Sequence, residues 1–126
     1  MAGTFEIYVK EHFSAAHCLW GYPGDCARMH GHNWTVEVYV QCTELNEIGV
    51  AVDFRDIRQA LREVLAGMDH YNLNELETFK DINPTSENIA KYLYEQLARV
   101  LNTQRVRVSK VRVTETPGAG ASYWED

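Results

Sequence analysis

This chain of 126 residues contains few cysteines, few prolines and no long hydrophobic run. The three cysteines, Cys18, Cys26 and Cys42, are odd in number and have no paired spacing, so we expect reduced thiols and no disulfide framework. No apolar stretch approaches the roughly 20 residues that a membrane-spanning helix needs. The first residues also lack the charged start and apolar run of a signal peptide. We therefore expect a cytoplasmic protein without a membrane partner.

Basic runs are absent as well. The formal net charge is −6, and no stripe of lysine and arginine could contact successive phosphates, so nucleic acid is not an expected partner. A hydrophobic content of 45% and a charged content of 24% are typical of a globular protein. Without repeats or low-complexity tracts, the chain is expected to form a single domain over residues 1–126.

Period-two alternation of apolar and polar residues predicts the strands. Residues 5–10 and 34–40 have this pattern and are expected to pair, and residues 105–115 and 121–124 predict two further strands. The valines of the third strand change phase along it, which predicts a bulge near Ser109 or Lys110. A short extended run is also expected at residues 50–52.

Apolar residues at helical spacing predict two helices between the second and third strands. The first follows Asp53 and ends near Gly67, and the second begins at Thr85 or Ser86, either of which could cap its free amides. The order is therefore ββααββ. Four strands with two helices on one face make an α+β domain, and its exposed sheet edges favour oligomerisation.

His30-Gly31-His32 is the most informative motif of the chain. Alternate residues of a strand face the same side, so the two imidazoles are expected to lie together. His17, at the end of the first extended segment, is a candidate third ligand, and three histidines with one open position describe a catalytic zinc site. On spacing alone, an exposed polar face remains an alternative for the pair, and ordinary packing remains one for His17.

Three other features carry candidate chemistry. Cys26 lies between Asp25 and Arg28, which argues against deep burial and favours a thiolate, although packing is its alternative. Asp69 precedes His70 just after a helix end, where the two could relay protons or simply cap a turn. Glu115 ends a strand; it could bind the edge of a heterocycle or be an ordinary exposed residue.

Together these segments resemble the 6-pyruvoyltetrahydropterin synthase and 6-carboxytetrahydropterin synthase family. The gap of three residues between Cys26 and His30 resembles the bacterial carboxy enzymes of queuosine biosynthesis. The resemblance runs from about residue 5 to the C-terminus and rests on five motifs in the same order: Phe13-Ser14-Ala15-Ala16-His17, Cys26-x-x-x-His30-Gly31-His32-Asn33, Asp69-His70-x-x-Leu73-Asn74, Pro84-Thr85-Ser86-Glu87-Asn88 and Thr114-Glu115-Thr116.

The resemblance implies a role for each matching residue. By position, His17, His30 and His32 match zinc ligands, Cys26 matches the catalytic thiol, and Asp69 and His70 match its proton-transfer partners. Glu115 matches the pterin anchor, while Thr85 and Ser86 resemble polar residues that line the pterin pocket. Sites of this family form where subunits meet, so the zinc facing Glu115 could belong to a neighbouring chain.

The implied fold is the tunnelling fold, an antiparallel sheet with paired helices that assembles into an oligomeric barrel, commonly a homohexamer built as a dimer of trimers. The implied activity is that of a zinc-dependent carbon–carbon lyase. It converts 7,8-dihydroneopterin triphosphate to 6-carboxy-5,6,7,8-tetrahydropterin, acetaldehyde and triphosphate. The alternatives are pyruvoyl-type triphosphate elimination on the same substrate, a non-catalytic zinc- or pterin-binding protein, and a structural zinc module with Cys26 as fourth ligand.

Overall fold

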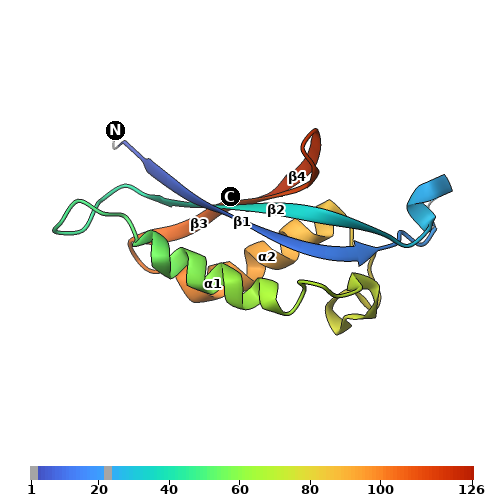
Figure 1. Cartoon of the computed structure of the whole chain (residues 1–126). Coiled ribbons are helices and arrows are strands. Elements are labelled where there is room, and N and C mark those ends of the chain that lie inside the picture. Colours follow the sequence, from blue (N-terminus) through green and yellow to red (C-terminus); the bar gives the residue numbers. More distant parts are fainter. Residues whose placement is uncertain (1–2, 22–23) are drawn as a thin grey trace.

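The computed structural model describes residues 3–21 and 24–126, which form one antiparallel sheet in the order β1-β2-β3-β4 with helices on one face (Figure 1). This confirms the predicted α+β fold and its ββααββ order. The strands are β1 (Phe5–His17), β2 (His30–Cys42), β3 (Val106–Thr116) and β4 (Ala119–Tyr123); the helices are α1 (Phe54–Ala66) and α2 (Ser86–Leu101), with short 3-10 turns η1 (Gly24–Ala27), η2 (Leu73–Glu75) and η3 (Glu77–Phe79).

The predicted pairing of the first two strands is confirmed, and it extends further than the alternating pattern indicated. β1 and β2 pair without a break from Phe5 opposite Cys42 to His17 opposite His30. In β2 every second side chain from Trp34 to Val40 is at most 1% exposed, because this face packs against the helices. Residues that alternate in phase with Trp34 along β2 therefore point to the face of the sheet that the helices cover.

The predicted bulge lies at Ser109. Tyr39 pairs with Lys110 and Val40 with Val108, so Ser109 is the extra residue of β3. One extra residue reverses the side-chain alternation, and valines on both sides of the bulge consequently point into the core. The phase change that was visible in the sequence is thus a consequence of this single residue.

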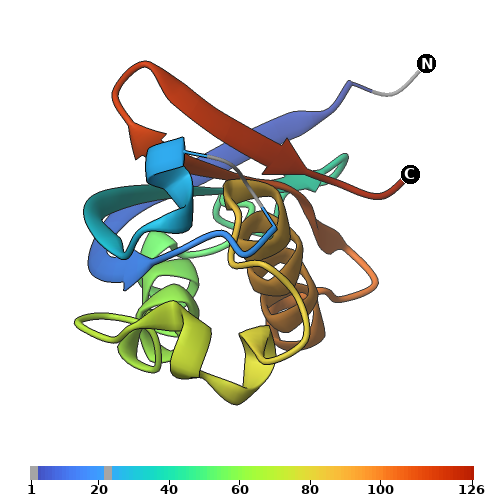
Figure 2. The same cartoon turned by 90° about the vertical axis from the view of Figure 1, so that its right-hand side faces the viewer.

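Both long helices cover the same face of the sheet (Figures 1 and 2). Asp53 caps α1 by accepting a hydrogen bond from the amide of Arg55, and Thr85 caps α2 by accepting one from the amide of Asn88, as predicted for Thr85. No helix among the described residues combines the length and the apolar character required to cross a bilayer. The buried helical residues Ile57, Leu61, Leu65, Ile89, Leu93 and Leu97 form the core together with the sheet valines.

Two predicted extended segments differ in the structure. The extended run expected at residues 50–52 is bent at residues 51 and 52 and belongs to the loop that leads into α1. β4 begins at Ala119 instead of residue 121, because Thr116 pairs with Ala119 across a two-residue turn. Gly120 lies in this strand, where a Cβ atom would stand 2.6 Å from the carbonyl oxygen of Val113. Only glycine permits this close approach of β3 and β4.

Candidate metal centre

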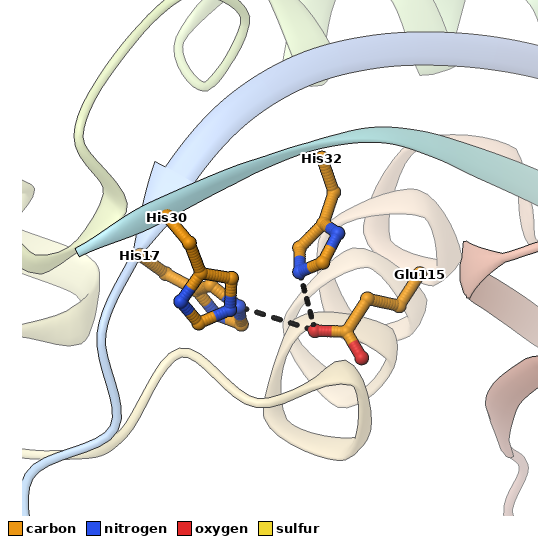
Figure 3. A group of neighbouring side chains, drawn as sticks. All are labelled: His17, His30, His32 and Glu115. Carbon is orange, nitrogen blue, oxygen red and sulfur yellow. Dashed lines mark ion pairs between the residues drawn. The ribbon is translucent and has the colours of Figure 1, made fainter. Parts of the chain in front are cut away.

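The three predicted histidine ligands lie together at the end of the sheet where β1 stops and β2 starts (Figure 3). His17 and His30 are directly opposite in the β1–β2 pairing, and their ring centroids are 4.6 Å apart. His32 follows on the same face, with its ring centroid 4.8 Å from that of His30. The buried ring of Trp34 packs edge-on against His17 and His32 and forms the apolar floor of the group.

His17 is held in a defined tautomer. Its side chain is 1% exposed, and its Nδ1 lies 2.7 Å from the carbonyl oxygen of Pro84, the residue just before the α2 cap. A carbonyl can only accept, so Nδ1 carries the proton and a neutral His17 presents the Nε2 lone pair to the other three side chains of the group. This orientation is typical of metal-binding histidines, whose second nitrogen donates to a backbone carbonyl.

His30 is arranged in the same way. Its Nδ1 lies 2.7 Å from the carbonyl oxygen of Arg28, two residues upstream, which again leaves the Nε2 lone pair free. The backbone of the segment between η1 and β2 therefore orients this ring. Two of the three predicted ligands are thus preset in the tautomer that binds a metal through Nε2.

Glu115 reaches the histidines from β3. The last β2–β3 pair is Thr35 with Thr114, so the same register carried one residue further places Glu115 beside Trp34, on the histidine face. Glu115 is also the extra residue of a bulge against β4, since Thr114 pairs with Gly120 and Thr116 with Ala119. Bulges redirect side chains, and this one accompanies a carboxylate directed at the histidines (Figure 3).

One oxygen of Glu115 contacts two histidines at once. Its Oε1 lies 3.1 Å from Nε2 of His17 and 3.0 Å from Nε2 of His32. Within the described part of the chain, neither of these buried nitrogens has a hydrogen-bond partner, and in neutral His17 the contact sets a lone pair against a carboxylate oxygen. Such a convergence of acceptors is stabilised by a cation. We call His17, His30, His32 and Glu115 the His/Glu cluster; its ligand atoms all lie within 4.8 Å of one another, and these donors fit a metal ion.

Electrostatics favours the neutral, metal-binding form of His32. Burial lowers its pKa, and the neighbouring His17 and His30 lower it further, while Glu115 acts in the opposite direction. A histidine must be deprotonated at the nitrogen that binds a metal, so a lowered pKa keeps this ligand available to lower pH.

Asp69 and His70 pair with each other outside the His/Glu cluster. Nδ1 of His70 lies 3.0 Å from Oδ2 of Asp69, and Oδ1 of Asp69 accepts a hydrogen bond of 2.8 Å from the amide of Ser14. That amide is the main cause of the lowered pKa of Asp69, so the carboxyl stays ionised beside the imidazole. His70 has a φ of 65°, which is uncommon outside glycine, and its side chain is 81% exposed.

The remaining predicted site residues have different surroundings. Thr85 uses its hydroxyl to cap α2 and Ser86 starts that helix, both next to the Pro84 carbonyl that holds His17. The backbone of Cys26 lies in η1, whereas its side chain lies outside the described part of the chain. The predicted roles of these three residues in substrate binding and catalysis therefore stay predictions.

Two asparagines were assigned no role from the sequence. The side chain of Asn74 accepts from the amide of Cys18 and donates to its carbonyl, both at 2.9 Å. The side chain of Asn83 makes the same two hydrogen bonds with Trp20: it accepts from the amide at 2.9 Å and donates to the carbonyl at 3.0 Å. Through these hydrogen bonds, the segment just after His17 is held against the segment that follows His70 and the segment that precedes Pro84. The sequence shows both asparagines, but these long-range contacts exist only in the fold.

A cavity of about 1130 Å³ lies at the opposite end of the molecule. It is bordered by the start of β1, the loop before α1 and the end of α2, and none of the predicted site residues whose side chains are described lines it. Its walls are largely apolar, so the convergent polar groups that mark a reactive site are at the His/Glu cluster instead.

Comparisons with known proteins agree with this geometry. The family model described as 6-pyruvoyl tetrahydropterin synthase matches residues 6–126. A Bacillus subtilis protein named 6-carboxy-5,6,7,8-tetrahydropterin synthase is 32% identical over 130 residues, covering 95% of this chain and 85% of the relative. A Synechocystis protein of the same name is 32% identical over 123 residues, covering 94% and 92%.

A solved structure is also similar along the full length. The Caenorhabditis elegans 6-pyruvoyl tetrahydropterin synthase superposes with a TM-score of 0.87 at 29% identity, covering 99% of this chain and 98% of that one. The likeness includes the four-stranded sheet with its two helices, which is the expected tunnelling fold. The chain therefore belongs to the 6-pyruvoyl tetrahydropterin synthase family of tetrahydropterin synthases.

Proposed function

We propose that this protein is a zinc-dependent 6-carboxy-5,6,7,8-tetrahydropterin synthase of queuosine biosynthesis. The reaction would convert 7,8-dihydroneopterin triphosphate to 6-carboxy-5,6,7,8-tetrahydropterin, acetaldehyde and triphosphate. The observation that carries the proposal is the contact of Glu115 Oε1 with the Nε2 atoms of His17 and His32, in a chain of this family. The names of the Bacillus and Synechocystis relatives support the carboxy product.

Zinc suits the side chains present. Imidazole nitrogen and carboxylate oxygen are ordinary zinc ligands, and His17, His30 and His32 would hold the ion. When bound there, zinc would act as a Lewis acid towards the side-chain hydroxyls of the substrate. The Pro84 and Arg28 carbonyls keep two of the imidazoles oriented for that task, so little rearrangement is needed on binding.

Proton transfer is assigned to Cys26, Asp69 and His70. Cys26 would act as the general base on the substrate side chain, as its place in the family motif implies. Asp69, ionised by its bond to Ser14, would hold Nδ1 of His70 and leave Nε2 for proton exchange. Glu115 would anchor the pterin through two hydrogen bonds to the heterocycle edge, with Thr85 and Ser86 beside it.

The exposed position of His70 favours a site shared between subunits. Its side chain is 81% exposed in the single chain and lies apart from the His/Glu cluster. β1 and β4 are the outer strands of the sheet, so each has one edge available for pairing with another copy. We infer a homohexamer, built as a dimer of trimers, with active sites at its interfaces and a cytoplasmic location.

Asn83 is expected to act as a positioning residue for the metal. Asn83→Ala would remove both hydrogen bonds to Trp20 and loosen the segment that presents the Pro84 carbonyl to His17. We expect zinc affinity to fall about tenfold, as when other outer contacts of metal ligands are lost. Competition with a chelator measures this.

A matched control exists at the far end of the fold. The side chain of Asn46 accepts hydrogen bonds from the amides of Ile48 and Val50. Asn46→Ala therefore also removes two hydrogen bonds between an asparagine side chain and the backbone. It should leave zinc affinity unchanged. Asn83→Asp keeps the acceptor for the Trp20 amide and should restore part of the affinity. Equal affinities in all variants would show that Asn83 has no influence on the site.

The nearest alternative is a 6-pyruvoyl product from the same substrate. The C. elegans structure named for that activity has the same fold, so the fold does not discriminate. A protein that binds zinc and pterin without turnover is an alternative of a different class. The spacing of Cys26 and His30 and the names of the bacterial relatives favour the carboxy product.

Product analysis tests the proposal. The zinc-loaded protein is incubated anaerobically with 7,8-dihydroneopterin triphosphate, the pterin is identified by mass spectrometry, and released aldehyde is trapped. 6-Carboxytetrahydropterin together with acetaldehyde is the expected result. A 6-pyruvoyl product without acetaldehyde would assign the sister activity, and bound pterin without turnover would assign a binding role.

A further inference from the structure

We propose that the cavity at the end of the fold opposite the metal centre is a binding site for a small apolar amine. The cavity has a volume of about 1130 Å³ and lies among the start of β1, the loop of residues 43–53 and the end of α2. This loop is at the left end of the molecule in Figure 1, whereas β1 ends at His17 on the right. The amine site would thus be separate from the site of the proposed reaction.

Large apolar side chains are exposed around this cavity. Four of its lining residues have exposed fractions between 48% and 81%: Phe5, Ile48, Phe54 and Val100. Single exposed apolar residues are ordinary on a protein surface, but several of them gathered around one cavity mark an interaction site. Sites for small molecules are concave and mostly apolar, with volumes of about 300–1000 Å³, so this cavity has room for a ligand of that class.

Hydrogen bonds hold the outer wall of the cavity in place without a ligand. The side chain of Asn46 accepts hydrogen bonds of 3.1 and 3.0 Å from two amides of its own loop. The guanidinium of Arg105 donates to the carbonyls of Glu44 and Ala51, at 3.0 and 2.7 Å, and so ties both ends of the loop to the start of β3. A preformed wall lowers the entropy cost of binding a small ligand.

The charges around the cavity favour a cationic ligand. Asp53, Asp56 and Glu63 bring three carboxylates to its α1 side, whereas Arg105 is the only cationic side chain among the described lining residues. Asp53 is paired with Arg55, but within the described part of the chain neither Asp56 nor Glu63 takes part in an ion pair. Being seven residues apart, these two carboxylates lie two turns apart on one face of α1. They would attract the ammonium group of an apolar ligand and repel a carboxylate.

A second copy of the chain fits this cavity less well than a small amine does. The surface is concave, so a copy turned onto the same surface by a two-fold axis would leave the cavity unfilled. Such a contact would also bring Asp56 and Glu63 of both copies together, and like charges across an interface oppose association. A small molecule with an apolar body and one positive charge satisfies both the shape and the charge.

Three probes that share one apolar body test the inference: 4-phenylbutylamine, 4-phenyl-1-butanol and 4-phenylbutyrate. At about pH 7 the amine is cationic and the acid is ionised. Titration of the full chain by methyl NMR gives the affinity and the location of each probe. We expect the amine to bind at least about tenfold more tightly than the acid, with the alcohol between them. Signals of Leu45, Ile48 and Val100 should shift, whereas Leu73, buried at the metal end of the fold, should not.

Three variants accompany the wild type. Asp56→Asn combined with Glu63→Gln should weaken binding of the amine about fivefold and leave binding of the alcohol unchanged. Glu77→Gln combined with Glu95→Gln is the matched control, because it removes the same charge from two exposed positions outside the cavity, and it should bind all probes as the wild type does. Val100→Trp, at an exposed position of the lining, should weaken all three probes by filling part of the cavity.

Several outcomes would overturn the inference. They are the absence of binding by any probe, shifts confined to other parts of the molecule, and equal affinities for the amine and the acid. Dissociation of an oligomer in Val100→Trp, measured by analytical ultracentrifugation, would make the cavity an interface between copies of the chain and would overturn the inference as well. The titration involves no turnover, so its result and that of the product analysis are independent.

Discussion

Replacing His17 by alanine is expected to abolish tight zinc binding and turnover together. His17 is buried, its Nδ1 is held by the Pro84 carbonyl, and its Nε2 contacts the Glu115 carboxylate. Loss of an outer contact of a metal ligand alone costs 10–100-fold in affinity, so loss of the ligand itself should cost more than about 100-fold. Chelator competition and the metal content of the purified protein measure this.

His12→Ala is the matched control for this prediction. His12 lies on the same strand but on the opposite face, where its ring is hydrogen-bonded to the Thr35 hydroxyl. This variant should keep full zinc affinity. Because His17 is buried, His32→Ala, at a more exposed position, provides a second ligand deletion if His17→Ala is unstable. Stoichiometric zinc in both ligand variants would refute the metal centre.

Replacing Cys26 by alanine is expected to reduce turnover by about 10²–10⁴-fold, the usual contribution of general acid–base catalysis. Zinc content and pterin affinity should be unchanged, because the predicted metal ligands are His17, His30 and His32. Steady-state kinetics and metal analysis on the same preparation separate the two effects.

Cys18→Ala is the control for the Cys26 variant. Cys18 is a free, partly buried cysteine whose contacts with Asn74 are made through its backbone, and these survive the substitution. It should retain most activity. Loss of zinc together with activity in Cys26→Ala would mean that the thiol binds the metal, as in the structural zinc module.

The parts of the fold that depend on local pattern were predictable. Alternating valines indicated paired strands, a phase change indicated the Ser109 bulge, and the Thr85 cap was visible next to a proline. His30 and His32 could be placed on one face because a strand alternates strictly. The prediction that residues 50–52 are extended was wrong, because this apolar segment bends within the loop before α1.

Contacts between distant segments were not predictable from pattern. The approach of Glu115 to His17 and His32 depends on the β2–β3 register and on a second bulge beside Gly120. The hydrogen bonds from Asn74 to Cys18 and from Asn83 to Trp20 likewise join residues more than 50 positions apart in the sequence. Only the folded chain shows that these groups act on the same site.

The measurement that tests the central claim most directly is zinc X-ray absorption of the loaded, substrate-free protein. The claim is that the His/Glu cluster binds the metal through nitrogen and oxygen and leaves Cys26 free for proton transfer. A shell of nitrogen and oxygen alone at about 2.0–2.1 Å is the predicted result. A sulfur scatterer at about 2.3 Å would make Cys26 a ligand and contradict the account.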